Sequence, residues 1–371
     1  MSAGNRIFVI LRIASLAFIA ALALSGSVRG QASVSPPQRY EGGSVFPQAT
    51  WQEIDPASLG WSKDRLEAAL SFAKEAGSTS GMIVQHGLVV AHWGDVARKS
   101  NLHSARKSLL SALIGIAVNK GQINLDQTLG QLGIDDTKPS LTSIEKQARL
   151  RDLIEARSGV YHPTVYETAG MLQSKPMRGS HAPGEFWYYN NWDFNTLGTI
   201  YETAVGISIF EAFQLEIATP IEMQDYRPAD GHYVEGGQVT RYPAYPIDMS
   251  ARDLARFGLL FLNQGRWGNR QIIPATWVEE STRPYSDTTG GGYGYMWRTE
   301  ISATERAISE PQGSKRTYWA QGHLGQFAVI CPQQDLVLVS LVDAKRTKQR
   351  MTQQQMKQLL GLIESAQFVD H

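Results

Sequence analysis

Residues 103–121, HSARKSLLSALIGIAVNKG, decide how the middle of this chain folds. From Leu109 to Val118 the segment is apolar on almost every side of a helix, which predicts a helix that is buried all round. Yet the same segment begins with Ser104 and Lys107, one helical turn apart. Because burying polar groups costs free energy, this pair at the start of a buried helix needs an explanation.

Two interpretations of the pair are open from this segment alone. In the first, Ser104 caps the helix and the side chain of Lys107 extends to solvent. In the second, Ser104 is a nucleophile, and desolvation lowers the pKa of Lys107 so that its neutral amine accepts the serine proton. The backbone N–H groups at the start of the helix would then face a developing oxyanion.

The spacing S-x-x-K occurs three times in the chain, so it is weak on its own. Ser71 lies in a predicted surface helix, and Ser143 lies in the first turn of another predicted helix. Only Ser104 begins a helix that must be buried. Among the three matches, the sequence therefore singles out Ser104 and Lys107, and both interpretations of this pair stay open.

The composition limits the class of protein. The 371 residues are 42% hydrophobic and 19% charged, which is ordinary for a globular protein with a sizeable core. The formal net charge is zero, which does not favour nucleic acid or an anionic membrane as a partner. The single cysteine, Cys331, excludes an internal disulfide. The eight histidines lack metal-ligand spacing and no dinucleotide or phosphate-binding motif occurs, so we expect neither a metal nor a cofactor.

The first thirty residues have the pattern of an export signal. Arg6 and Arg12 lead into a short apolar stretch, and the residues that follow it permit cleavage before Gln31. The alternative is a retained membrane anchor, since apolar residues begin at Ile7. We predict a signal peptide over residues 1–30, a periplasmic or secreted protein, and no stable membrane insertion after cleavage.

The order of the predicted elements indicates an α+β fold. Residues 31–60 are rich in Pro, Gly and Ser and are predicted to form an extended arm, and residues 61–371 a single domain with a helical lobe at about 103–245. Strand patterns at 81–95, around a His86-Gly87 turn, and at 325–343 predict one antiparallel sheet built from both ends of the chain. Helices that flank the sheet or form the lobe are predicted at 62–77, 103–121, 142–159, 249–265 and 351–369.

A second candidate stretch is PGEFWYYNNWDFNTLG, residues 183–198. It contains Y-x-N in two registers, Tyr188 with Asn190 and Tyr189 with Asn191. A tyrosine near a lysine can exchange protons with it, and an amide can hold a substrate carbonyl group. The alternatives are aromatic packing or a sugar-binding loop.

A third candidate stretch is YWAQGHLGQFAVICP, residues 318–332, where Gly322 and Gly325 flank His323 before a strand. If Gly325 lets a substrate approach the strand, His323 faces a binding cleft. The alternative is a plain turn that enters an edge strand, and the same H-x-G pattern also occurs at His92.

Taken in order, S-x-x-K, Y-x-N and H-x-G resemble the motifs of the serine β-lactamase and penicillin-binding superfamily. The segments LRDLIEARSGV, YNNWDFNTLG and MSARDLARFGLLFLNQG also resemble segments of that superfamily. The resemblance covers roughly residues 60–365 and is closest to the class C-like branch, with its esterases and 6-aminohexanoate-dimer hydrolases. It implies a β-lactamase/transpeptidase-like fold in which residues 61–371 are the catalytic domain.

The resemblance also implies a role for each site residue. Ser104 would be the nucleophile of an acyl-enzyme mechanism, with Lys107 and Tyr189 as the general acid–base pair. The resemblance selects the register of Tyr189 and implies that Asn191 orients the substrate, together with His323 and Gly325. The oxyanion hole would be formed by the backbone N–H groups of Ser104 and Gln326.

The third motif departs from the family pattern, because His-Leu-Gly stands where relatives that process β-lactams carry a lysine that helps to hold the substrate carboxylate. Histidine is largely neutral near pH 7, so the sequence favours a small-molecule ester or amide as substrate. The alternatives are β-lactamase or D-amino-acid peptidase activity and, in another class, a non-catalytic protein that binds cell-wall fragments.

Overall fold

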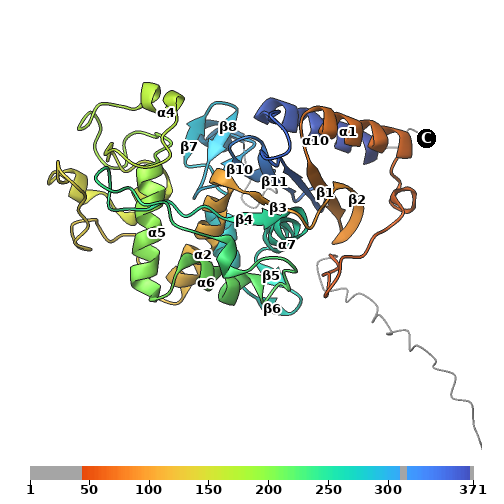
Figure 1. Cartoon of the computed structure of the whole chain (residues 1–371), viewed down its shortest axis with the longest axis horizontal. Helices are drawn as coiled ribbons and strands as arrows, with labels where there is room; N and C mark the ends of the chain where they lie inside the picture. Colours follow the sequence, from red (N-terminus) through yellow and green to blue (C-terminus); the bar gives the residue numbers. More distant parts are fainter. Residues whose placement is uncertain (1–43, 310–315, 368–371) are drawn as a thin grey trace, which may run out of the picture. The chain divides into compact units, whose positions relative to one another are not determined.

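The central sheet joins the two ends of the chain. The computed structural model describes residues 44–309 and 316–367, and within them eight strands pair in the order β2-β1-β12-β11-β10-β9-β8-β7. Ser80 of β1 pairs with Leu341 of β12, so a strand near the start of the chain lies beside a strand near its end. The predicted α+β fold, with an antiparallel sheet built from both ends of the chain, is confirmed (Figure 1).

The elements have the following bounds. The strands of the central sheet are β1 (Ser80–Gln85), β2 (Leu88–Gly94), β7 (Ser286–Thr288), β8 (Gly291–Tyr293), β9 (Arg298–Thr299), β10 (Tyr318–Gly322), β11 (Gln326–Cys331) and β12 (Leu336–Leu341). Two short antiparallel pairs are β3 (Lys99–Asn101) with β4 (Asp248–Ser250), and β5 (Arg266–Trp267) with β6 (Arg270–Gln271). The helices are α1 (Lys63–Glu75), α2 (Arg106–Asn119), α3 (Leu150–Ile154), α4 (Ala169–Ser174), α5 (Asn191–Val205), α6 (Ile209–Phe213), α7 (Ala251–Leu262), α8 (Ala275–Ser281), α9 (Ala303–Ser309) and α10 (Gln353–Gln367).

Helices cover both faces of the sheet. Figure 1 shows α1 and α10 side by side along one face, where Leu66, Ile83 and Leu359 belong to one buried cluster. Helix α7 packs on the other face, and its Gly258 lies directly against Val337 of β12. A side chain at Gly258 would separate the helix from the strand, so this glycine allows the close packing.

Helix α2 is buried along nearly its whole length, as its sequence predicts. Every residue from Arg106 to Ala117 is buried, and Gly115 lies against the ring of Trp277 in α8. Because neighbours surround the helix on all sides, its apolar residues show no single buried face. The buried helix therefore fixes the position of residues 103–105, which directly precede it.

The structure confirms the first hairpin and changes one predicted helix. His86 and Gly87 have φ of +53° and +78°, as a two-residue turn between β1 and β2 requires. The helix predicted over 142–159 begins at the expected capping box but is interrupted after Gln147. Ala148 is extended there, and its carbonyl oxygen accepts a hydrogen bond from the Leu129 N–H at 2.8 Å. Pairing with a distant segment therefore overrides the local helical pattern.

Of the arm predicted over residues 31–60, the structure describes residues 44–60. Residues 44–60 follow the edge of β2, where the Ile54 N–H donates to the Val89 carbonyl oxygen at 3.1 Å. The signal peptide predicted for residues 1–30 lies outside the described residues. Among the residues that are described, we find no helix with both the length and the apolar character needed to cross a membrane.

Candidate active site

Ser104 lies in a tight turn at the start of α2. Residues His103–Ala105 form one turn of 3₁₀ helix that runs directly into α2, and Ser104 does not cap either helix, since the N-cap positions are Leu102 and Ala105. His103 has φ of +47°, an uncommon conformation for a residue with a side chain, and its N–H donates to Asn101 Oδ1 at 2.8 Å. Ser104 is therefore held by a strained turn rather than serving as a helix cap.

The reactive pair predicted from the sequence is joined by a tyrosine. The Nζ atom of Lys107 lies 2.8 Å from Ser104 Oγ and 2.8 Å from Tyr189 Oη. Tyr189 precedes α5, and the neighbouring Tyr188 is directed elsewhere, since its hydroxyl donates to the Met171 carbonyl oxygen at 2.8 Å. Of the two registers of Y-x-N, the structure brings Tyr189 to the reactive pair.

The surroundings of Lys107 favour its neutral form. Its side chain is 2% exposed, and none of the described carboxylates forms an ion pair with it. Burial lowers the pKa of Lys107 well below the usual value, and the positive charges of Arg106 and Arg298 lower it further. A neutral amine beside Ser104 Oγ can accept a proton from it.

Two opposing effects act on the pKa of Tyr189. Burial raises its pKa, whereas the hydrogen bond with Ser104 and the charges of Arg298 and Arg106 offset part of that rise. The tyrosine is therefore a proton donor in the resting site, next to an amine that can accept protons.

These groups open onto one cavity of about 410 Å³. None of the described residues that line it is acidic. The lining residues are Asn101, His103, Ser104, Arg106, Lys107, Tyr166, Thr168, Met171, Tyr189, Asn191, Pro246, Arg298, Gln321, Gly322 and His323. Five residues chosen from the sequence are thus brought together, namely Ser104, Lys107, Tyr189, Asn191 and His323.

Asn191 begins α5 and has a free acceptor. Its Nδ2 donates to the Tyr166 carbonyl oxygen at 2.8 Å, and its Oδ1 has no hydrogen-bond partner among the described residues. An unsatisfied amide oxygen in the cavity wall is suited to accept a hydrogen bond from a ligand.

Gly325 and Gln326 lie outside the lining of the cavity, which differs from the expectation. Residues 323–325 form the turn between β10 and β11, and Gly325 faces Met351. The Gln326 side chain is buried, and its Nε2 donates to the Val342 carbonyl oxygen at 2.8 Å. The predicted motif contains a hairpin turn, and the glycine in the cavity wall is Gly322, at the end of β10, which lies against the carbonyl oxygen of Leu102.

Two arginines in the cavity wall were not selected by the sequence analysis. Arg298 on β9 places its guanidinium carbon 5.4 Å from the centroid of the Tyr293 ring and 5.7 Å from those of Trp187 and Tyr189. Arg106 lies between Ser104 and Lys107 in the sequence. Arg298 ends the stretch GGYGYMWR, and only the pairing of β9 with β10 brings it to the site.

Two histidines lie at the same wall. The rings of His103 and His323 pack edge to face with centroids 5.7 Å apart. Burial lowers the pKa of His103 to about 4, and the neighbouring His323, Arg106 and Lys107 act in the same direction. His103 is therefore neutral at physiological pH and adds no charge to the cavity.

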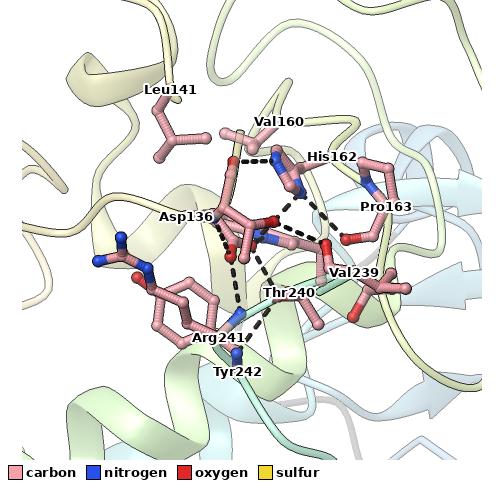
Figure 2. A network of polar contacts seen from close by, with 12 residues as sticks. Asp136, Leu141, Val160, His162, Pro163, Val239, Thr240, Arg241 and Tyr242 are labelled. Carbon is pink, nitrogen blue, oxygen red and sulfur yellow. Dashed lines mark hydrogen bonds and ion pairs between the residues drawn. The ribbon is translucent and has the colours of Figure 1, made fainter. Parts of the chain in front are cut away.

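Asp136 lies in a buried network of polar contacts with His162, Thr240 and Arg241 (Figure 2). Asp136 Oδ2 accepts hydrogen bonds from Trp192 Nε1 at 2.7 Å and from Thr240 Oγ1 at 2.6 Å. Its Oδ1 accepts from the Arg241 N–H at 2.7 Å, and His162 Nδ1 lies 3.4 Å from Oδ2. Trp192 follows Asn191 directly, so this carboxylate fixes the segment that carries Tyr189 and Asn191 into the cavity.

No group of three or more histidine, cysteine or acidic side chains that could hold a metal ion occurs within the described ranges. The cavity is lined by the serine, the lysine and the tyrosine of the cluster described above and by two arginines.

The fold and this cluster define a serine hydrolase. Residues 67–361 match the family model described as Beta-lactamase, and the chain belongs to the β-lactamase family. A similar protein, an uncharacterized protein of Alkalihalophilus pseudofirmus, is 21% identical over 299 residues, which are 71% of this chain and 83% of that protein.

Solved structures of the family share the fold. A Bacillus anthracis protein assigned as a 6-aminohexanoate-dimer hydrolase has a TM-score of 0.60 at 19% identity and covers 87% of both chains. A β-lactamase of Mycobacterium bovis has a TM-score of 0.53 at 19% identity, covering 80% of this chain and 97% of its own. A class C β-lactamase has a TM-score of 0.57 at 14% identity, covering 86% of this chain and 99% of its own. At these identities the likeness concerns the fold.

Proposed function

We propose that this protein is a serine hydrolase that cleaves a carboxylic ester or a small amide through an acyl-enzyme on Ser104. The observation that carries the proposal is the position of Lys107 Nζ, within 2.8 Å of both Ser104 Oγ and Tyr189 Oη at the wall of one cavity. A nucleophile, a desolvated base and a proton donor within hydrogen-bonding reach of each other are what acyl transfer requires.

In the acylation step, Ser104 Oγ attacks the carbonyl carbon of the substrate while its proton passes to Lys107 Nζ. When the tetrahedral intermediate collapses, Tyr189 donates its proton to the leaving alcohol or amine, and Lys107 returns a proton to Tyr189. In deacylation, water attacks the acyl carbon and gives up a proton to the same pair. Ser104 Oγ then leaves as the free hydroxyl and the carboxylic acid is released.

The negative charge of the tetrahedral intermediate needs hydrogen-bond donors. The backbone N–H groups of Ser104 and His323 have no acceptor among the described residues, and both residues line the cavity. We propose these two groups as the oxyanion hole, with His323 in place of the Gln326 predicted from the sequence. Removing one such donor typically costs about 10²–10³ in kcat.

A second candidate activity is hydrolysis of a β-lactam or a D-amino-acid peptide. It is favoured by Arg298, whose charge reaches the cavity and has no acidic partner among the described residues. Such substrates carry a carboxylate, and a guanidinium binds a carboxylate through charge-assisted hydrogen bonds. Arg298 supplies a positive charge to a cavity whose third motif has histidine in place of the family's lysine.

Labelling of the nucleophile tests the proposal. The protein is incubated with a fluorophosphonate and with p-nitrophenyl butyrate, and the adduct is located by mass spectrometry, with Ser104→Ala as the control. An adduct on Ser104 and turnover of the ester support a hydrolase. Absence of both, with retained binding of cell-wall fragments, would identify a binding protein instead. A panel of nitrocefin, D-amino-acid amides and aminohexanoate oligomers then separates the two candidate activities.

A further inference from the structure

Arg106 carries a buried positive charge with no acidic partner among the described residues. Its side chain is 4% exposed, and none of the ion pairs within the described ranges includes it. One of its nitrogens donates to the His103 carbonyl oxygen at 2.7 Å, and its guanidinium carbon lies 4.7 Å from the centroid of the Tyr245 ring. Its Nε has no hydrogen-bond partner in the same part of the chain. The contacts that Arg106 makes are thus with neutral groups.

An unpaired buried cation is costly, and most proteins pair such a group with a carboxylate. A carbonyl oxygen and an aromatic face solvate a guanidinium without cancelling its charge. The field of Arg106 is therefore available to act on the next residue, Lys107, which is also buried.

Within the described part of the chain, the groups that surround Lys107 carry no negative charge. From the turn before α2 come the Ser104 hydroxyl and the His103 ring, from α5 and the segment before it come the Phe194 ring and the Tyr189 hydroxyl, and from α2 and β9 come the two arginines. If Lys107 were protonated, it would be a third cation beside Arg106 and Arg298 with no counter-charge. Like charges in a desolvated site strongly disfavour that state.

We infer that Arg106 is a positioning residue that keeps the Lys107 amine in its neutral form, ready to accept the proton of Ser104. This inference rests on the proposed function, because the neutral amine matters only if Ser104 is the nucleophile. Lysine bases in other enzymes are activated in the same way, by desolvation and a neighbouring cation. The contribution of Arg106 to the lowered pKa of Lys107 comes second to that of burial and before that of Arg298.

The hydrogen bond from Arg106 fixes where this charge acts. His103 is the strained residue immediately before Ser104, and Arg106 binds its carbonyl oxygen. The guanidinium is thereby held at a set distance from the turn that carries the nucleophile. Among the described residues, Arg298 forms no such hydrogen bond: it contacts three aromatic rings and is half-buried rather than buried.

Substitutions of Arg106 can separate the effect of its charge from the effect of its packing. Arg106→Lys keeps the charge, whereas Arg106→Gln and Arg106→Met remove it. Arg266→Gln is the matched control, because Arg266 is exposed on β5 and does not line the cavity. The readout is the pH dependence of kcat/KM for p-nitrophenyl butyrate and of the rate of fluorophosphonate labelling.

Without the charge at residue 106, Lys107 should hold its proton more tightly. We therefore expect the acidic limb of both profiles to move to higher pH by about one pH unit in the two neutral variants. Arg106→Lys should keep the limb near that of the wild type, as should the control. If the rate of a neutral variant falls by the same factor at every pH and the acidic limb stays at the pH of the wild type, Arg106 has a purely structural role and the inference is overturned.

A measurement on the unsubstituted protein covers the case in which the neutral variants do not fold. NMR of protein labelled with ¹³C at the lysine Cε positions reports the charge of Lys107 directly, with Lys107→Met to assign its signal. A protonated Lys107 at pH 7 would overturn the inference whatever the variants do. If the wild type neither labels nor turns over, the proposed function fails, and the same titration compared between the wild type and Arg106→Gln still tests the effect of Arg106 on Lys107.

Discussion

The α-carbon of Gly322 lies so close to the carbonyl oxygen of Leu102 that a methyl group on residue 322 would overlap that oxygen. Leu102 begins the turn that carries Ser104, and Gly322 ends the strand that forms the opposite wall of the cavity. The two walls can meet at this distance only because residue 322 has no side chain. This contact sets the separation between the nucleophile and the N–H of His323.

Replacing Gly322 with alanine should therefore impair catalysis. The new methyl group must push β10 away from the Ser104 turn, and a displacement of about 1 Å at a reacting centre can cost about 10²-fold in rate. We expect kcat/KM of Gly322→Ala to fall by about that factor in ester hydrolysis. Gly361→Ala in α10 is the matched control, because a methyl group there meets no neighbouring atom. Equal activity of both variants would contradict the assignment.

Some of this arrangement could be predicted from the sequence. The buried helix that follows Ser104 can be predicted, because its apolar residues form a pattern within one short segment. The His86-Gly87 hairpin is visible for the same reason, since a two-residue turn needs residues that accept positive φ. The serine and the lysine are predictable from the S-x-x-K spacing at the start of this helix, and the tyrosine from the Y-x-N pattern together with the family resemblance.

The remaining parts depend on contacts between distant segments. Arg298 reaches the cavity because β9 pairs with β10 at Trp319, and no local pattern records that pairing. The turn at residues 323–325 moves Gly325 and Gln326 out of the site, although the H-x-G pattern itself is present. The interrupted helix after Gln147 follows from a hydrogen bond to a strand-like segment. Each of these outcomes requires the tertiary structure.

The choice among the three S-x-x-K matches gives a direct test. Ser104→Ala should lower kcat by about 10⁴-fold or more, since it removes the nucleophile, and it should prevent formation of the acyl adduct. Ser71 and Ser143 are exposed and lie outside the cavity, so Ser71→Ala and Ser143→Ala should behave as the wild type. Steady-state kinetics and intact-protein mass spectrometry measure both effects. Loss of the adduct in either control would show that the nucleophile is another serine.

Lys107 should affect activity and stability in opposite directions. Lys107→Arg should lower kcat by about 10²–10⁴-fold, because arginine cannot give up its proton. The pKa of Lys107 is lower in the folded protein than in the unfolded chain, so the unfolded chain binds the proton more tightly and the folded state loses stability as pH falls below the unfolded value. Lys107→Met, which has no charge to bury, should therefore melt at a higher temperature than the wild type at pH 7 while being inactive. Thermal unfolding at several pH values checks this, and a lower melting temperature for Lys107→Met would contradict it.

Asp136 should matter for stability more than its distance from the nucleophile implies. Its carboxylate is fully buried and accepts hydrogen bonds from Thr240 and Arg241 (Figure 2). It also accepts one from the indole N–H of Trp192. Asp136→Ala leaves these donors unsatisfied, and each buried donor left without a partner costs about 1–3 kcal/mol. Asp126→Ala is the control, since its ion pair with Arg151 is exposed and pairs of that kind contribute less than about 1 kcal/mol. Urea denaturation gives both values, and a similar small loss in the two variants would show that the network is dispensable.

The charge of the substrate should be recognised by Arg298. Its guanidinium is the half-buried cation of the cavity wall, held by the rings of Trp187, Tyr189 and Tyr293. A hydrogen bond to a charged group contributes about 1.5–3 kcal/mol, which corresponds to a factor of about 10–100 in kcat/KM.

The test compares p-nitrophenyl butyrate with the mono-p-nitrophenyl ester of succinic acid, which has the same chain length and ends in a carboxylate. Arg298→Gln should lower kcat/KM for the acidic ester by that factor relative to the neutral one, and Arg298→Lys should lie between Arg298→Gln and the wild type. Added salt should reduce the preference of the wild type, because the charge is partly exposed. If Arg298→Gln slows both esters equally, the arginine acts on Tyr189 and Lys107 alone, and the cavity selects a neutral substrate, as the histidine in the third motif had indicated.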